Sequence, residues 1–155
     1  MSNEKRMKIL FLCTGNSCRS QMAEGWARHL KSDVVDASSA GIAPHGIDPR
    51  AVAAMDEAGV DISGQNSKDV AEFLGEPFDY VVTLCGGAAE TCPVFPGKTK
   101  RLHAGFDDPP SLAADAADED EAMSHYKRVR DEIRDWIAAL PDGLDAPADA
   151  VESGS

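Results

Sequence analysis

The sequence predicts an α/β fold: a single domain with a four-stranded parallel sheet and helices on both faces. Two observations support this prediction. Short apolar runs alternate along the chain with amphipathic stretches of helical periodicity, which is typical of a parallel sheet covered by helices. The 155 residues, 43% of them hydrophobic, are enough for one core. We therefore expect one domain over residues 1–140, followed by an acidic tail, 141–155, that has no apolar period and is predicted to be disordered.

Four segments are predicted to be strands. A continuous apolar run opens the series (MKILFL), and DYVVTL is a similar run in the middle of the chain. Uninterrupted apolar runs of this length are typical of strands that are buried on both faces. The fourth segment is the weakest of the set. The predicted strands are residues 7–12, 34–37, 79–84 and 98–102.

The helices are predicted from apolar spacing and from capping residues. Asp48 followed by Pro49 is typical of a helix start, and Gly59 is expected to end that helix. Ser67 is expected to cap a short helix. The acidic side chains Glu24, Asp36 and Glu57 are interpreted as surface groups of helices or loops. The predicted helices are residues 21–31, 49–58, 68–74 and 119–140, the last with a stripe of Tyr126, Val129, Ile133, Trp136, Ile137 and Leu140.

Charge and cysteine content narrow the classes of function. The formal net charge is −12 and the pI about 4.6, which argues against a nucleic-acid partner, since binding a phosphate backbone needs a basic face. The charged start, Met1 to Arg6, and the short apolar run after it predict no leader peptide and no membrane partner. Four cysteines without a leader favour reduced thiols and a cytoplasmic location. Nothing in the sequence indicates an obligate oligomer, so a monomer is expected.

The segment LFLCTGNSCRSQMAEGW places Cys13 at the end of the first predicted strand and Arg19 at the start of a helix. Small residues between them allow backbone N–H groups to form a cradle for an oxyanion, next to the positive end of the helix dipole. Arg19 can close this cradle with its planar fork. A helix start and a cation also predict a lowered pKa for the Cys13 thiol. The predicted oxyanion-binding residues are Thr14, Gly15, Asn16, Ser17, Cys18, Arg19 and Ser20.

The simplest alternative is a buried structural cysteine in a strand-to-helix turn, and for Cys18 we favour that interpretation. Farther along, Cys85 ends the third strand and Cys92 follows seven residues later. Parallel strands meet at one edge, so Cys85 is expected near Cys13, and a relay of thiols becomes possible. A zinc site is the rival interpretation, but the spacing C-x6-C is wider than structural zinc sites prefer. Cys92 could also be a plain core cysteine.

The segment HAGFDDPPS is a candidate source of a general acid. Either Asp107 or Asp108 could reach over the cradle and protonate a leaving oxygen, because the prolines stiffen the turn. A solvated turn is the alternative. His45, in GIAPHGIDP, is interpreted as a loop residue.

Together these motifs resemble those of the thioredoxin-coupled arsenate reductases built on the low-molecular-weight protein tyrosine phosphatase fold. The resemblance runs from about Lys8 to Ile137 and includes CTGNSCRSQMAEGW, SAGI with HG-x-x-P, VVTLC-x6-CP, GFDDP and RVRDEI. The loop C-x5-R-S alone would specify only the phosphatase superfamily. The pair Cys85 and Cys92 is more specific to the reductases.

The resemblance implies a mechanism with no bound cofactor. Cys13 attacks arsenate held by Arg19, and Asp108 protonates the leaving oxygen. Cys85 then attacks Cys13 and releases arsenite. Cys92 finally attacks Cys85, and thioredoxin is the implied partner that reduces the last disulfide.

Two departures from the family are expected to matter. Some members bind potassium through residues that match Asn16, Glu24 and Ser39 here, but the position of a further aspartate ligand is Lys68. An ammonium group there would repel potassium, so we expect no metal, or a weak site at most, with the lysine in its place. Pro110 and Ser111 stand where related phosphatases carry aromatic residues, which weighs against a phosphomonoesterase, the runner-up function. A redox sensor without turnover is the third hypothesis.

Overall fold

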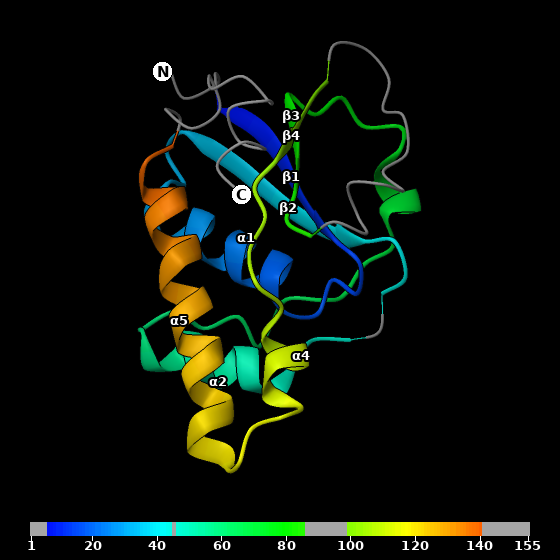
Figure 1. Cartoon of the computed structure of the whole chain (residues 1–155). Coiled ribbons are helices and arrows are strands. Elements are labelled where there is room, and N and C mark those ends of the chain that lie inside the picture. The colour runs from blue at the N-terminus through cyan, green and yellow to red at the C-terminus, as the bar shows by residue number, and fades with distance from the viewer. Residues whose placement is uncertain (1–5, 45, 86–98, 141–155) are drawn as a thin grey trace.

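The computed structural model of the chain describes residues 6–44, 46–85 and 99–140 (Figure 1). Four parallel strands form one sheet in the order β2-β1-β3-β4. The predicted single-domain α/β fold with a four-stranded parallel sheet is confirmed. The strands are β1 (Met7–Cys13), β2 (Val35–Gly41), β3 (Tyr80–Thr83) and β4 (Lys100–His103), and the helices are α1 (Arg19–Leu30), α2 (Pro49–Glu57), the 3-10 helix η2 (Val70–Phe73), α4 (Pro109–Ala113) and α5 (Glu119–Ala138).

The central position of β1 determines where the loops meet. Its last residue, Cys13, pairs with Gly41 of β2, and Leu12 pairs with Thr83 of β3. The carboxyl ends of these three strands therefore lie at the same edge, as the parallel arrangement requires. This register places the loop after Cys13 beside the segment that contains Cys85.

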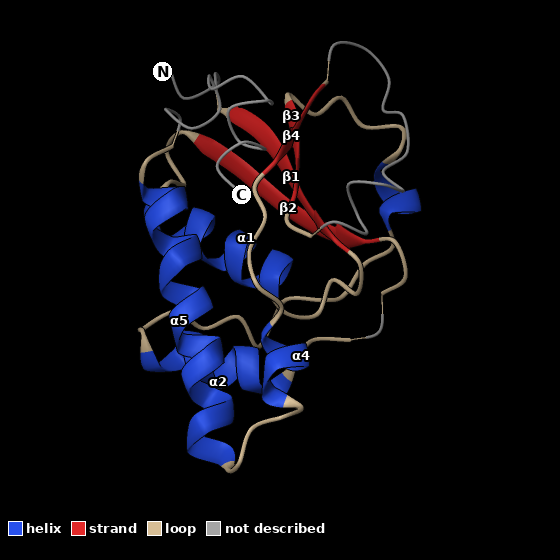
Figure 2. Cartoon of the chain, in the orientation of Figure 1, coloured by secondary structure: helices blue, strands red, loops and turns tan. Residues whose placement is uncertain are grey.

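The helices cover the two faces of the sheet unequally. Figure 2 shows α1, α2, α4 and α5 gathered on one side. There α1 packs against β1 and β2, and α5 packs against α1, α2 and α4. The stripe predicted for α5 faces this core, where Tyr126, Val129 and Ile133 are buried. On the other face η2 contributes Val70 to a smaller apolar cluster with Leu10 and Leu12.

Two helical elements differ from the sequence prediction. The short helix is a 3-10 turn that begins after Asp69, because the Asp69 side chain accepts from the Ala71 N–H and forms a capping box with Glu72. Ser67 is not its cap. The predicted stiff turn after Asp108 continues into α4, since proline is well tolerated in the first turn of a helix.

One predicted helix start is confirmed, and one strand is longer than predicted. Asp48 caps α2 by accepting from the Arg50 N–H, as predicted. β2 extends beyond the predicted end, through Gly41. The predicted tail, His45 and Cys92 lie outside the described residues. In the ranges that the structure describes, no helix is both long and apolar enough to cross a bilayer.

Candidate functional site

The loop between β1 and α1 is held from outside by the segment that follows β2. The Ile42 N–H donates to the Cys13 carbonyl at 3.2 Å, and the Ala43 N–H donates to the Thr14 carbonyl at 2.8 Å. The Asp48 N–H donates to the Ser17 carbonyl at 2.9 Å. These carbonyl groups are thus engaged by residues outside the loop, which fixes the loop without using its N–H groups.

A buried side-chain network supports the same loop. Asn16 has a positive φ of 46° and is fully buried. Its side-chain N–H donates to Ser20 Oγ at 2.8 Å, and its Oδ1 accepts from Gln21 Nε2 at 3.0 Å and from the Lys68 N–H at 2.7 Å. The left-handed conformation is one that asparagine tolerates better than most residues. Asn16 and Ser20 therefore stabilise the loop through buried side-chain hydrogen bonds.

Gly41 packs directly against this network. A Cβ at Gly41 would lie 2.7 Å from the Thr14 carbonyl oxygen and 2.9 Å from the Asn16 nitrogen. Only glycine fits at this distance. Gly41 and Gln21 support the loop, although no sequence pattern predicts this role for them. The motif SAGI contained the glycine, but nothing local indicates which backbone approaches it.

The structure brings two of the predicted thiols together. Cys13 and Cys85 are both buried, and their Sγ atoms lie 3.6 Å apart. Thr14 Oγ1 lies 3.2 Å from Cys85 Sγ. Cys13, Cys18 and Cys85 are all thiols rather than disulfides. Cys18 is 3% exposed and belongs to the core cluster under α1, in agreement with its interpretation as a packed residue.

The pKa of Cys13 differs from the sequence prediction. Its hydrogen bond to Cys85 and its burial raise the pKa above that of an ordinary thiol, while the charge of Arg19 acts in the opposite direction. The prediction of a lowered pKa is therefore wrong for this arrangement. It took into account the cation and the helix start, but a thiol that donates to a second buried sulfur is stabilised in its protonated form.

This arrangement predicts the effect of removing the second thiol. Cys85→Ala takes away the acceptor that holds the Cys13 proton, so the pKa of Cys13 should fall. The pH dependence of Cys13 alkylation by iodoacetamide, followed on its own peptide by mass spectrometry, should shift to lower pH. An unchanged or higher midpoint would show that Cys85 does not control the Cys13 proton.

Arg19 and Asp108 line the same small pocket. Arg19 Nη1 donates to the Phe106 carbonyl at 2.9 Å, and Nη2 lies 3.4 Å from Asp108 Oδ1. Arg19 Nε is buried and has no partner among the described residues. A buried N–H without an acceptor is costly, and an oxyanion would supply one. The pocket encloses about 220 Å³ and is lined by Cys13, Thr14, Gly15, Ser17, Cys18, Arg19, Asp108 and Pro110.

The two candidate acids have different surroundings. Asp108 Oδ2 accepts from Ser111 Oγ at 2.7 Å, so the carboxyl is held at the pocket wall by a side chain of α4. Asp107 instead pairs with Arg128 of α5 at 3.0 Å. Of the two aspartates, Asp108 is the one that the structure places at the pocket.

Lys68 contacts two of the residues that match a potassium site, Glu24 and Asn16. Ser39 Oγ donates to Glu24 Oε1 at 2.5 Å, and Lys68 Nζ lies 3.7 Å from the same oxygen. Arg28 pairs with Glu24 Oε2 at 2.7 Å. Glu24 is 2% exposed, so its interpretation as a surface residue was wrong: it compensates two cations behind the loop. Glu57 is exposed, as predicted, whereas Asp36 is half-buried and lies in strand β2 rather than in a helix or loop.

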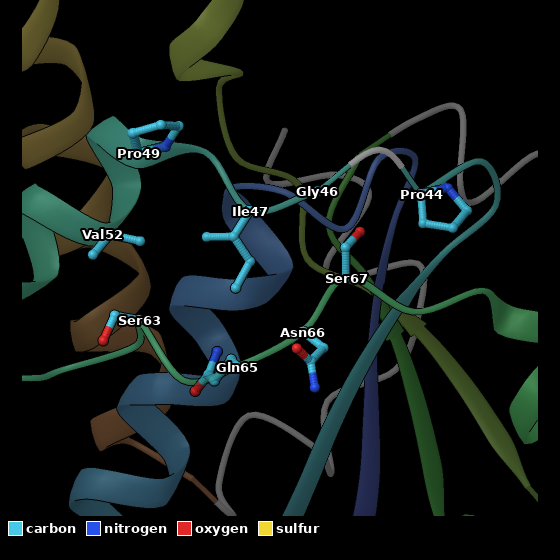
Figure 3. Close-up of a pocket in the computed structure, with 9 residues that line it drawn as sticks. All are labelled: Pro44, Gly46, Ile47, Pro49, Val52, Ser63, Gln65, Asn66 and Ser67. Atoms are coloured by element: carbon cyan, nitrogen blue, oxygen red, sulfur yellow. The ribbon is translucent and has the colours of Figure 1, made fainter.

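A larger pocket of about 700 Å³ lies beside the loop and includes none of the predicted site residues (Figure 3). One of its lining residues, Ser67, donates to the Gly15 carbonyl at 3.2 Å. The pocket therefore lies next to a residue that supports the loop, and not next to the thiols. We place the functional site in the smaller pocket, where thiol, guanidinium and carboxyl groups meet. The larger one is lined by Pro44, Gly46, Ile47, Pro49, Val52, Ser63, Gln65, Asn66 and Ser67.

A four-stranded parallel sheet with a cysteine-to-arginine oxyanion loop defines a class of protein. The chain belongs to the low molecular weight phosphotyrosine protein phosphatase family, whose model matches residues 8–148. Two curated relatives narrow the comparison. An arsenate reductase of Halalkalibacterium halodurans is 54% identical over 125 residues, which cover 81% of this chain and 88% of that protein. An arsenate reductase of Bacillus subtilis is 53% identical over 125 residues, with the same coverage.

A solved structure agrees with these relatives. It is described as an arsenate reductase in the phosphate binding state, and it matches with a TM-score of 0.68 and 28% identity over 90% of this chain and 99% of that one. The resemblance to arsenate reductases of the phosphatase fold, predicted from the motifs, is confirmed.

Proposed function

We propose that this protein reduces arsenate to arsenite with electrons from its own thiols, and that thioredoxin returns it to the reduced state. The observation that carries the proposal is the 3.6 Å separation of Cys13 Sγ and Cys85 Sγ at an oxyanion-sized pocket. The curated relatives named arsenate reductase support the choice of substrate. A second thiol at this position has a use in reduction and none in ester hydrolysis.

The first step is a displacement at arsenic. Arsenate enters the pocket with its charge facing Arg19, whose Nε gains an acceptor. The Cys13 thiol proton passes to the bound dianion, which is a base, and Cys13 Sγ forms a bond to arsenic. Asp108 donates a proton to the departing oxygen, which leaves as water. Arsenic is still in its pentavalent state in this adduct.

The second step carries the two electrons. The Cys85 thiol passes its proton to an oxygen on arsenic, and Cys85 Sγ attacks Cys13 Sγ. The bond between Cys13 Sγ and arsenic breaks, and its electron pair stays with arsenic. Arsenite leaves, and the two sulfurs are oxidised to a disulfide. Because Thr14 Oγ1 lies 3.2 Å from Cys85 Sγ, its hydroxyl can stabilise the attacking thiolate.

Cys92 and thioredoxin complete the cycle in this proposal. Cys92 attacks Cys85, Cys13 leaves as a thiol, and thioredoxin reduces the resulting Cys85–Cys92 disulfide. A reducing cytoplasm is the compartment that fits this chemistry. In this proposal the chain acts as a monomer. The reaction needs no redox cofactor, since every electron comes from cysteine.

Hydrolysis of phosphomonoesters is the alternative function, and the match to a phosphatase family supports it. It would use the same loop and acid, with water attacking a thiophosphate at Cys13. Pro110 at the pocket rim offers no aromatic surface for a phosphotyrosine ring. We therefore expect hydrolysis to be a side activity of the loop.

The role of Cys92 gives a direct test. Cys92→Ser should complete at most one turnover and accumulate the Cys13–Cys85 disulfide, because no thiol remains to resolve it. The measurement is arsenite released per chain, with and without thioredoxin, together with disulfide mapping. Sustained thioredoxin-dependent turnover by this variant would show that the relay does not need Cys92.

A further inference from the structure

We propose that Tyr126 of α5 is a positioning residue for the oxyanion loop and acts through Asp48. The inference rests on the proposed function only in that the loop must hold an oxyanion. Tyr126 is not among the residues that line the pocket. Its effect is transmitted by a single carboxylate that the loop, α2 and α5 share.

Asp48 makes three connections at once. Its N–H donates to the Ser17 carbonyl at 2.9 Å and so holds the middle of the loop. Its Oδ1 accepts from the Arg50 N–H at 2.9 Å and caps α2. Its Oδ2 accepts a hydrogen bond from the Tyr126 hydroxyl. The carboxylate orients a backbone group of the loop at one end and is itself oriented by α5 at the other.

The Tyr126 hydroxyl stays protonated and therefore remains a hydrogen-bond donor. Tyr126 is 1% exposed, and burial together with the Asp48 carboxylate raises the pKa of its hydroxyl above the ordinary tyrosine value. It therefore keeps its proton at neutral pH. The neighbouring Arg50 and Glu119 form two hydrogen bonds, at 2.8 Å and 3.1 Å, that join the first turns of α2 and α5.

The charge of Asp48 acts on a residue of the loop. Burial is the largest cause of the raised pKa of Cys18, which precedes Arg19, and the Asp48 carboxylate is the next largest. The Tyr126 hydroxyl donates to the carboxylate and so keeps Asp48 in the position where its N–H meets Ser17.

Tyr126→Phe tests the inference with inorganic phosphate as the probe, titrated by calorimetry into the reduced full chain. We expect roughly tenfold weaker phosphate binding, in the range measured for hydrogen bonds to charged groups. The matched control is Trp26→Phe, which removes another buried hydrogen bond to α5, from Trp26 Nε1 to the Arg130 carbonyl at 3.1 Å. The control should lower thermal stability but keep phosphate affinity within about twofold.

A double-mutant cycle with Asp48→Asn separates positioning from general destabilisation. Asparagine caps helices well, but its neutral amide oxygen holds the Tyr126 hydroxyl less firmly than a carboxylate does, so Asp48→Asn alone should weaken phosphate binding roughly fivefold. In that background, Tyr126→Phe should cost less than about twofold. If Tyr126→Phe fails to fold, Asp48→Asn alone tests the inference.

Four results would overturn the inference: unchanged affinity in Tyr126→Phe, an equal loss in both backgrounds, an equal loss in Trp26→Phe, or unchanged affinity in Asp48→Asn alone. Failure of the proposed function would give a different set of results. A wild type that binds phosphate but keeps its thiols when given arsenate is no reductase, and the binding results for Tyr126 still stand. A wild type that binds no phosphate contradicts both.

Discussion

Cys13→Ser is expected to abolish arsenate turnover, with a loss on the order of a thousandfold or more, while the chain stays folded. A serine hydroxyl is a far weaker nucleophile than sulfur and cannot pair with Cys85 Sγ in a disulfide. The substitution removes little volume from the cluster that contains Leu10 and Val81, so the fold should tolerate it. Arsenite formation with a thioredoxin system is the measurement.

Phosphate binding to the same variant is the control for an intact loop. The loop is held by Gly41, Asn16 and Gln21, none of which the substitution changes. Retained binding with lost turnover would assign the loss to the nucleophile. Residual reduction above about one per cent of the wild-type rate would rule out Cys13 as the attacking group.

Arg19→Lys has the second largest expected effect, a loss of roughly a hundredfold in phosphate affinity and in arsenate turnover. Lysine supplies one point charge in place of a planar fork. It cannot offer the buried Nε to an oxyanion while also donating to the Phe106 carbonyl and pairing with Asp108, as Arg19 does. Calorimetry with phosphate and steady-state arsenite formation would measure the two losses.

Arg28→Lys is the matched control, because Arg28 lies on the same helix and its side chain is 58% exposed. Lysine keeps a positive charge beside Glu24, so this variant should keep phosphate affinity within about twofold. Near wild-type phosphate affinity in Arg19→Lys would mean that the fork is not what holds the anion.

The sequence predicts those parts of the fold that depend on local patterns. Continuous apolar runs identify β1 and β3, and Asp48 with Pro49 identifies the start of α2. Parallel pairing then explains why Cys85 lies near Cys13, although they are 72 positions apart. The resemblance identified the functional class because the oxyanion loop and the acid loop are each one contiguous stretch of the chain.

The remaining features arise from contacts between distant segments. Glu24 reads as a surface carboxylate of an amphipathic helix, yet it is buried because Ser39 and Lys68 approach it from other elements. The raised pKa of Cys13 has the same origin, since the controlling partner, Cys85, comes from another strand end. The sequence pattern predicts Tyr126 only as one apolar position of a core stripe. The role of its hydroxyl depends on the hydrogen bond to Asp48, which comes from a distant segment.

Mapping of thiols after exposure to arsenate tests the central claim most directly. Fully reduced protein is given arsenate without any reductant, quenched with an alkylating agent and analysed by mass spectrometry. We predict the loss of two thiols per chain, a disulfide between Cys85 and Cys92, alkylated Cys13 and Cys18, and one arsenite released. Four alkylated cysteines and no arsenite, with phosphate esters still hydrolysed, would contradict the account and identify the chain as a phosphatase.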